Sequence, residues 1–124
     1  MDEFEALLTE AGKRGFLWFM FRSDLHGPAV VAGVYQWPGS ADVFVLVDQE
    51  QAHAYRVPTC TESDVFEPDS VLWWYGGCPV WTLRALLALP EPCHPEAPGP
   101  LGPAPCGSGI KGERVPVRMR RRGN

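Results

Sequence analysis

The hydrophobic positions near the start of the chain follow a helical period. Four of them recur at the spacing i, i+3, i+4 and i+7, which places them on one face of a helix over residues 3–12: Phe4, Leu7, Leu8 and Ala11. Asp2 precedes this segment as a candidate N-cap, with Glu5 three residues later as in a capping box. Gly12 or Gly15 provides the residue that ends the helix.

The next part of the chain has the pattern of β-strands. Four segments carry it: residues 16–22, 29–36, 42–48 and 52–57. The first three are nearly continuous in hydrophobicity, which favours central strands covered on one face and partly hidden on the other. The fourth alternates, with His53, Tyr55 and Val57 facing one way. Because the connections are short, neighbouring strands must be antiparallel, and the segments form a meander.

An apolar helix ends the patterned part of the chain. A short strand over residues 71–75 precedes it and is broken by Gly76 and Gly77, and the helix then covers residues 79–89. Its only charge is Arg84, so the helix must be covered over most of its circumference. Either the sheet or a second copy of the chain provides this cover, and the sequence therefore raises the hypothesis of a homodimer.

The composition changes after this helix. Residues 90–109 contain seven prolines and four glycines without periodicity, and such a segment buries too little apolar area to offset its ordering entropy. We therefore expect one domain over residues 1–90 and a flexible, disordered Pro/Gly-rich tail with a basic end over residues 91–124. A short strand around Val117 at the sheet edge is the less favoured alternative. The predicted fold class is α+β: an N-terminal helix, an antiparallel meander of four to five strands, and a C-terminal helix packed on the sheet.

The net charge of −4 is unevenly distributed along the chain. Residues 1–110 carry five basic and fourteen acidic side chains, a net charge of −9, and residues 111–124 carry six basic and one acidic, a net charge of +5. An acidic body is not typical of a nucleic-acid-binding fold, so nucleic acid is not expected as a partner. The basic end could still bind an anionic surface or an acidic protein through its arginines: Arg118, Arg120, Arg121 and Arg122.

The sequence indicates a cytoplasmic protein. No apolar run approaches the ~20 residues that span a bilayer. The run over residues 16–21 follows Lys13 and Arg14, but it is too short for a signal peptide and no small-residue cleavage site follows it. The four cysteines are therefore expected to be thiols in a reducing compartment rather than disulfides.

The five tryptophans are a high number for a chain of this length. Four of them lie in or next to apolar runs: Trp18, Trp73, Trp74 and Trp81. Packing in the core is the first interpretation of such positions, and an exposed aromatic side chain at a binding surface is the alternative.

Cys78 is the sharpest candidate for catalytic or redox chemistry. It follows a strand and two glycines and precedes Pro79 at the predicted start of a helix, where unpaired N–H groups stabilise a thiolate. The Cys-Pro pair resembles the start of glutaredoxin-like active sites, but Trp81 stands where their second cysteine belongs. A cysteine that only fills space in the interior is the alternative.

The remaining motifs do not assemble a cofactor or metal site. The candidate metal ligands lack the close pairs of structural zinc sites: Cys60, Cys78, Cys93, His94 and Cys106. Gly107, Gly109 and Gly112 match a phosphate-binding pattern without the strand and helix that it requires. His26 and His53 have no catalytic partner at a recognisable spacing. We expect neither a metal nor a cofactor.

The acidic loop over residues 58–70 is the candidate binding surface, through Glu62, Asp64 and Glu67. It lacks the glycine and the ligand pattern of a calcium loop. Because no catalytic set converges, the best hypothesis is a small non-enzymatic binding or regulatory module that acts on an unknown protein partner. A redox protein or sensor that uses Cys78 is one alternative. Association of the arginine-rich end with an anionic surface or nucleic acid is the other.

Overall fold

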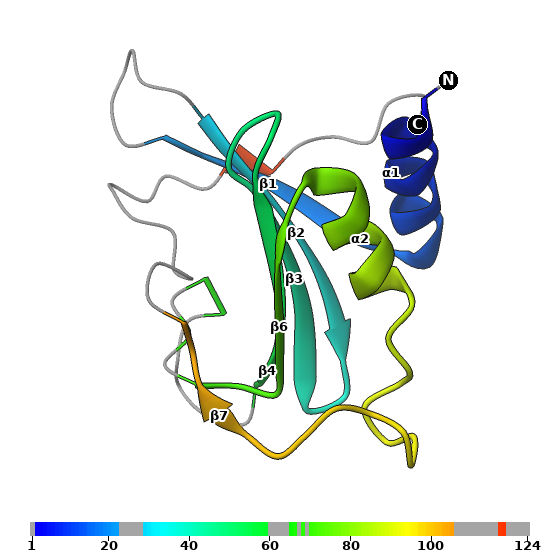
Figure 1. Ribbon diagram of the computed structural model, residues 1–124, viewed down its shortest axis with the longest axis vertical. Coiled ribbons are helices and arrows are strands. Elements are labelled where there is room, and N and C mark those ends of the chain that lie inside the picture. The colour runs from blue at the N-terminus through cyan, green and yellow to red at the C-terminus, as the bar shows by residue number, and fades with distance from the viewer. Residues whose placement is uncertain are drawn as a thin grey trace.

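A computed structural model of the 124-residue chain describes residues 2–22, 29–59, 65–66, 68 and 70–105 and the backbone of 117–118. The fold is α+β, as predicted (Figure 1). In chain order the elements are α1 (Glu3–Arg14), β1 (Leu17–Arg22), β2 (Ala29–Trp37), β3 (Ser40–Leu46), β4 (Ala52–Pro58), β5 (Ser70–Val71), β6 (Trp73–Gly77), α2 (Pro79–Leu87), β7 (Gly102–Pro103) and β8 (Val117–Arg118).

Six of the strands form one antiparallel sheet in the order β6-β4-β3-β2-β1-β8. The four strands from β1 to β4 are the predicted meander, each paired with the next along the chain. Pro38 and Gly39 form the turn from β2 to β3, and Gly39 has a φ of 83°, which glycine adopts without steric cost. β6 then joins the outer edge of β4, so that it becomes the end strand of the sheet.

Helix α1 forms as the local sequence predicts. The Asp2 carboxylate accepts a hydrogen bond of 2.8 Å from the backbone N–H of Glu5, and acidic residues occupy the first turn. Gly15 ends the helix in the left-handed region, at a φ of 109°, where a side chain would be strained. The helix is two residues longer than predicted because Lys13 and Arg14 continue it up to Gly15.

Both helices pack on one face of the sheet (Figure 1). The apolar residues predicted for α1 meet Leu83 and Leu86 of α2 above Phe44 and Ala54 of the sheet. Polar contacts tie both ends of α1 to α2. The Arg14 guanidinium donates to the Leu87 carbonyl at 2.6 Å, and Arg84 pairs with the Glu3 carboxylate.

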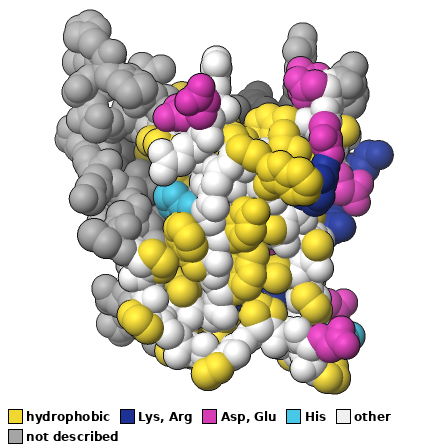
Figure 2. Space-filling model, viewed as in Figure 1, with side chains coloured by type: hydrophobic (Ala, Val, Ile, Leu, Met, Phe, Trp, Pro, Cys, Tyr) yellow, Lys and Arg dark blue, Asp and Glu magenta, His cyan; other side chains and the backbone are white. Residues whose placement is uncertain are grey.

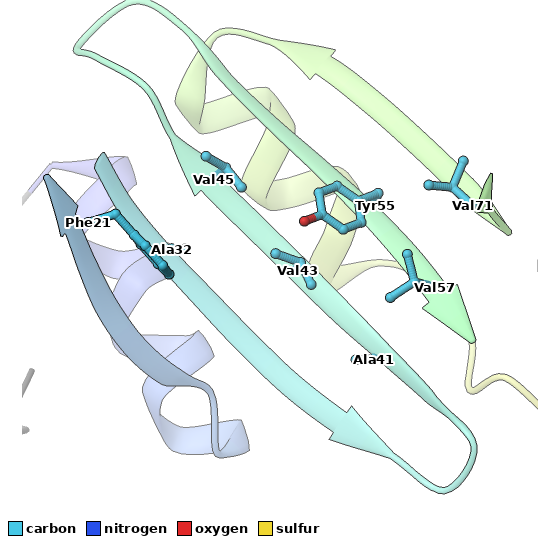
Figure 3. Packing of buried hydrophobic residues seen from close by; sticks show 8 residues of the cluster. All are labelled: Phe21, Ala32, Ala41, Val43, Val45, Tyr55, Val57 and Val71. Atoms are coloured by element: carbon cyan, nitrogen blue, oxygen red, sulfur yellow. The ribbon is translucent and has the colours of Figure 1, made fainter. Parts of the chain in front are cut away.

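The other face of the sheet carries a second apolar cluster, which Figure 3 shows on the side away from the helices: Phe21, Ala32, Ala41, Val43, Val45, Tyr55, Val57 and Val71. The alternation predicted for β4 is confirmed here. Part of the chain after β4 covers this cluster, because Val65, Phe66 and Ala104 pack against it. The Tyr55 hydroxyl donates to the Val65 carbonyl at 2.6 Å, which holds the loop against the sheet.

A buried ion pair joins β3 to β4. Arg56 lies opposite Asp42 in the ladder and donates to both oxygens of its carboxylate, at 2.6 Å from Nε and 3.0 Å from Nη2. The indole N–H of Trp37 donates to the same carboxylate at 2.9 Å. Arg56 is 1% exposed and Asp42 4% exposed. A bidentate geometry at this depth orients both side chains and links three neighbouring strands.

The second half of the chain differs from the prediction in four ways. The single strand predicted over residues 71–75 forms two strands of different sheets, β5 and β6, and helix α2 ends at Leu87 rather than at residue 89. Gly76 and Gly77 do not break the strand but belong to β6, because they pair with His53 and Ala52 of β4. Short strands also form in the segment expected to lack structure. Gly102–Pro103 pairs with β5, and Val117–Arg118 pairs with β1, the alternative that was less favoured. The domain boundary at residue 90 stays a prediction.

The two described helices have 12 and 9 residues. In the part of the chain that the structure describes, no helix has the length and hydropathy needed to cross a membrane.

We expect Asp42→Ala to lower the free energy of unfolding by about 3–5 kcal/mol, because the Arg56 charge then stays buried without its partner. Urea denaturation followed by circular dichroism measures this loss. The exposed pair of Glu10 and Arg14 provides the control. Glu10→Ala should cost less than about 1 kcal/mol. Equal losses of stability in the two variants would contradict this expectation, because removing one partner of a buried ion pair would then cost no more than removing one partner of an exposed pair.

Candidate functional site

The end strand β6 exposes aromatic side chains. Trp74 is 38% exposed and Tyr75 37% exposed, although both belong to a strand of the sheet. The cause is the sequence of β6. Trp73, Trp74 and Tyr75 are consecutive, so they point alternately to the two faces, and an end strand has a neighbour on one side only. No other described strand pairs with its free edge.

The aromatic rings of β6 are held in place on both faces. On the helix face, the rings of Trp73 and Tyr75 stack at 6.2 Å and 11°. On the other face, the Trp74 ring stacks with His53 at 6.3 Å and 19°. The Trp74 indole also lies over Gly76, where a Cβ atom would come within 2.4 Å of the ring. The glycine therefore provides the space in which the indole lies flat along the strand.

Helix α2 carries a further exposed aromatic side chain. Trp81 is 59% exposed, and the Arg84 guanidinium lies over its ring at 4.7 Å. The buried side of α2 lies close to the end of β6. A Cβ on Gly77 would meet Thr82 Oγ1 at 4.0 Å, and Ala85 follows Thr82 by one turn. Arg84 also pairs with the Glu3 carboxylate of α1, so that it links the Trp81 ring to the other helix.

We refer to Trp73–Gly77 as the aromatic edge. Figure 2 shows hydrophobic side chains gathered over β6 and α2, with acidic and basic side chains mainly at the margins of the view. The five residues of β6 contain no charged side chain and no proline. Exposed apolar patches of this kind, bordered by polar residues, are typical of protein interaction sites.

Two hollows flank the turn between β3 and β4, at the N-terminal end of α2. One, of about 490 Å³, is lined by Asp48, Glu50, Gln51, Ala52, His53, Trp74, Gly76, Gly77 and Cys78. The other, of about 450 Å³, is mostly apolar and is lined by Phe4, Val31, Leu46, Val47, Asp48, Gln49, Cys78, Pro79 and Val80. Cys78 and Asp48 border both hollows, so a ligand in either one would touch the start of α2.

The structure places Cys78 where the sequence predicted it. Cys78 is the N-cap of α2, and Pro79 follows at the first position of the helix. Its thiol is free and exposed, and its side chain makes no capping hydrogen bond. It is therefore not the buried packing residue of the alternative interpretation. Its reactivity stays a prediction.

The candidate metal ligands do not come together among the described residues. No group of three or more His, Cys, Asp or Glu side chains is close enough there to hold an ion. Cys93 is free and exposed, and His94 Nδ1 accepts a hydrogen bond of 3.0 Å from the backbone N–H of Glu96. Cys60 and Cys106 lie outside the described residues.

Most of the predicted binding residues lie outside the described part of the chain: Glu62, Asp64, Glu67, Arg120, Arg121 and Arg122. The same holds for His26 and for the three glycines of the phosphate-binding pattern. Arg118 is described through its backbone, which pairs with Phe19 at the β1 edge. His53 is 8% exposed and also stacks with Tyr55, at 6.1 Å and 19°.

Comparison of the chain with protein-family models, with curated proteins and with solved structures finds no match.

No residue of the aromatic edge was among the predicted site residues, and an exposed aromatic side chain at a binding surface was only the alternative interpretation of its tryptophans. Core packing was expected for four tryptophans, and it holds for Trp18 and Trp73, which pack against the helix-side cluster. For Trp74 and Trp81 it is wrong, because both are exposed. The feature of the sequence that could have indicated this exposure is the row of three aromatic residues in a short strand. Such a strand has apolar side chains on both faces, and both faces stay covered only in the middle of a sheet.

We expect a maleimide to label Cys78 in the native protein within about tenfold of its rate in the urea-unfolded chain, because the thiol is exposed. Mass spectrometry of the labelled peptides measures both rates, and Cys93, also exposed, serves as the internal control. Cys78→Ser should change the free energy of unfolding by less than about 0.5 kcal/mol. Labelling of Cys93 without Cys78 would contradict the exposed thiol.

Proposed function

We propose that this protein is a non-enzymatic binding module that recognises a protein partner by adding a strand of that partner to the free edge of β6. The observation that carries the proposal is an end strand with exposed aromatic side chains on both faces and no charge along it. Strand addition supplies affinity through backbone hydrogen bonds and specificity through side chains of alternate residues. Trp74 and Tyr75 would contact such residues on opposite faces.

The absence of protective features on β6 supports this proposal. Proteins shield the edges of their sheets with lysines, prolines, bulges or covering segments, because an open edge pairs with other chains. Trp73–Gly77 contains no lysine and no proline, and it pairs with β4 residue for residue without a bulge. An edge with which no described strand pairs, and which carries large aromatic side chains, is better explained by a partner than by solvent exposure alone.

The acidic loop between β4 and β5 is a second surface for the same kind of function. Glu62, Asp64 and Glu67 flank Val65 and Phe66 in the sequence. Phe66 lies edge-to-face against Phe21 with ring centres 4.8 Å apart, and the Val65 carbonyl accepts the Tyr55 hydroxyl. Because Val65 and Phe66 are held against the sheet, this part of the loop has a defined position. This favours a role for the loop in binding a partner through the neighbouring carboxylates.

The other hypotheses remain proposals of lower rank. The exposed Cys78 thiol beside two hollows favours a redox or thiol role, but its side chain has no hydrogen-bonded catalytic partner among the described residues. Association of the arginine-rich end with an anionic surface or nucleic acid rests on the charge of residues 111–124 alone. A cytoplasmic localisation likewise rests on the sequence.

The proposal predicts that Tyr75→Lys weakens peptide binding at least about tenfold, since lysine on an edge strand disfavours pairing with another strand. The probe is a set of peptides selected on the immobilised wild-type protein from a phage-displayed random library. Their affinities for wild type and variant are then measured by fluorescence anisotropy in dilute protein.

Leu17→Lys is the matched control, because Leu17 is an exposed apolar strand residue, 44% exposed, that lies on β1 and not on β6. Circular dichroism must show that both variants fold. Peptides that bind both lysine variants as well as wild type, or failure to select any peptide, would reject strand addition at β6.

For the acidic loop, we expect the triple variant Glu62→Lys, Asp64→Lys and Glu67→Lys to lose binding to basic selected peptides by about tenfold or more at low salt, because three attractive charges become repulsive. Raising the ionic strength should reduce the difference between wild type and variant. A charge reversal of Glu5, Glu10 and Glu96 at other exposed positions is the control. Unchanged binding in the loop variant removes the loop from the proposed surface.

A further inference from the structure

We propose that the partner strand added to β6 carries an arginine whose guanidinium binds in the hollow of about 490 Å³ beside Trp74, called here the edge hollow. The inference deepens the proposed function and rests on it, since it names the chemistry of the partner at the same surface. Trp74, Gly76 and Gly77 belong both to the free edge and to the lining of this hollow. A strand paired with that edge lies about 4.8 Å beyond β6 and therefore passes the hollow.

The edge hollow combines an indole with two acidic residues. Asp48 and Glu50, from the turn between β3 and β4, line it and are exposed. No lysine or arginine is among its lining residues, and neither acidic residue has an ion-pair partner in the described part of the chain. A cation in the hollow therefore complements its charge, whereas an anion is repelled.

The two acidic residues have different roles. Asp48 Oδ1 accepts hydrogen bonds from the backbone N–H groups of Glu50 and Gln51, at 2.7 and 2.8 Å, so this carboxylate shapes the turn. Glu50 takes part in the turn through its backbone, and its carboxylate has no hydrogen-bond partner among the described residues. Glu50 is therefore the residue whose charge is available to a ligand, and Asp48 holds it in position.

The Trp74 ring provides a flat surface at the same hollow. It lies over Gly76 and beside His53, so its exposed surface is on the side away from the strand. A guanidinium is planar, and it can stack on an aromatic ring while its N–H groups donate to a carboxylate. An ammonium group has the charge without the plane. The pairing of an indole with a carboxylate therefore favours arginine over lysine.

Two sets of tryptophan, arginine and carboxylate already occur in this chain, one exposed and one buried: Trp81, Arg84 and Glu3, and Trp37, Arg56 and Asp42. The guanidinium carbon lies 4.7 Å from the ring centroid in the exposed set and 5.9 Å in the buried set. The edge hollow has the tryptophan and the carboxylates of such a set, but its lining includes no arginine. An arginine of the added strand completes it.

Peptide selection tests the proposal on the full wild-type chain. Peptides selected on the immobilised protein from a phage-displayed random library should share an arginine at one constant position. Citrulline at that position should weaken binding at least about tenfold, because it keeps the length of the side chain but has no charge. Fluorescence anisotropy measures both affinities. Selected peptides without a constant arginine, or with equal affinity for the citrulline form, overturn the proposal.

Glu50→Gln tests the carboxylate. We expect it to weaken the arginine peptides about threefold at low salt, and the loss should shrink as the ionic strength rises. Glu5→Gln is the matched control, because it changes the net charge equally at an exposed position of α1 outside the lining. Equal affinities of the two variants for the arginine peptides contradict the pairing with Glu50.

Trp74→Leu tests the contact with the ring through a double-mutant cycle. The ratio of arginine to citrulline affinity should be at least about threefold smaller in Trp74→Leu than in wild type, because the indole supplies part of the preference for the charge. A general weakening of the strand lowers both affinities and leaves this ratio unchanged. Circular dichroism must show that the variant folds. An unchanged ratio rejects the stacking of the guanidinium on Trp74.

N-acetyl-arginine amide distinguishes an arginine on an added strand from a free small cation. It should bind at least about a hundredfold more weakly than the selected peptides, since it lacks their backbone pairing. If it binds as tightly as they do and is indifferent to Tyr75→Lys, the hollow is a small-molecule site and this inference is rejected.

The inference and the proposed function fail separately. Peptide binding that depends on Tyr75 but not on arginine or Glu50 rejects the inference alone, and strand addition at β6 stands. Failure to select any peptide, or peptide binding that is indifferent to Tyr75→Lys, rejects the proposed function and the inference with it.

Discussion

The buried pair of Arg56 and Asp42 is the constraint on which the arrangement of the sheet depends. The Asp42 carboxylate is satisfied by three bonds, two from Arg56 and one from Trp37, while Arg56 Nη1 is buried without a hydrogen-bond partner among the described residues. Burying two charges at this depth is costly unless they are paired, so the pair has to stay in register. A shift of β4 by one residue would separate the charges and turn Tyr55 and Val57 to the helix side. The pair thereby specifies the register of β4, and β4 in turn positions β6, which it alone pairs with among the described strands.

Glycines opposite or beside aromatic side chains are the second organising feature. Gly33 lets the Trp18 ring lie flat on β2, between α1 and the sheet, where Trp18 also meets Phe44 edge-on at 6.3 Å. Gly76 does the same for Trp74 at the free edge. In both places an indole ring lies against a glycine, but the two rings differ in how far neighbouring elements cover them. Inside the sheet the indole is covered and contributes to the core, whereas at the edge one side of it stays available.

Local patterns predicted the first half of the chain well. Helix α1, its capping by Asp2 and Gly15, and the meander from β1 to β4 follow from short-range spacing and short turns, which the sequence displays directly. The continuation of β6 through Gly76 was missed because pairing with β4 is a tertiary contact that outweighs the weak strand preference of glycine. The exposure of Trp74 and Trp81 was missed for a related reason. Periodicity identifies an apolar face but does not show whether a neighbouring strand or helix covers it.

The pairing of β5 with β7 gives the chain between them a defined beginning and end. Val71 lies opposite Gly102, so β6 and α2 occupy a loop of about thirty residues that a two-residue ladder closes. Closing a loop of that length has an entropic cost that grows only slowly with its length, and the proline-rich stretch after α2 lowers it further by restricting the open chain. The segment from residue 90 to 105, which reads as a tail in the sequence, is therefore the path by which the chain returns from α2 to pair with β5.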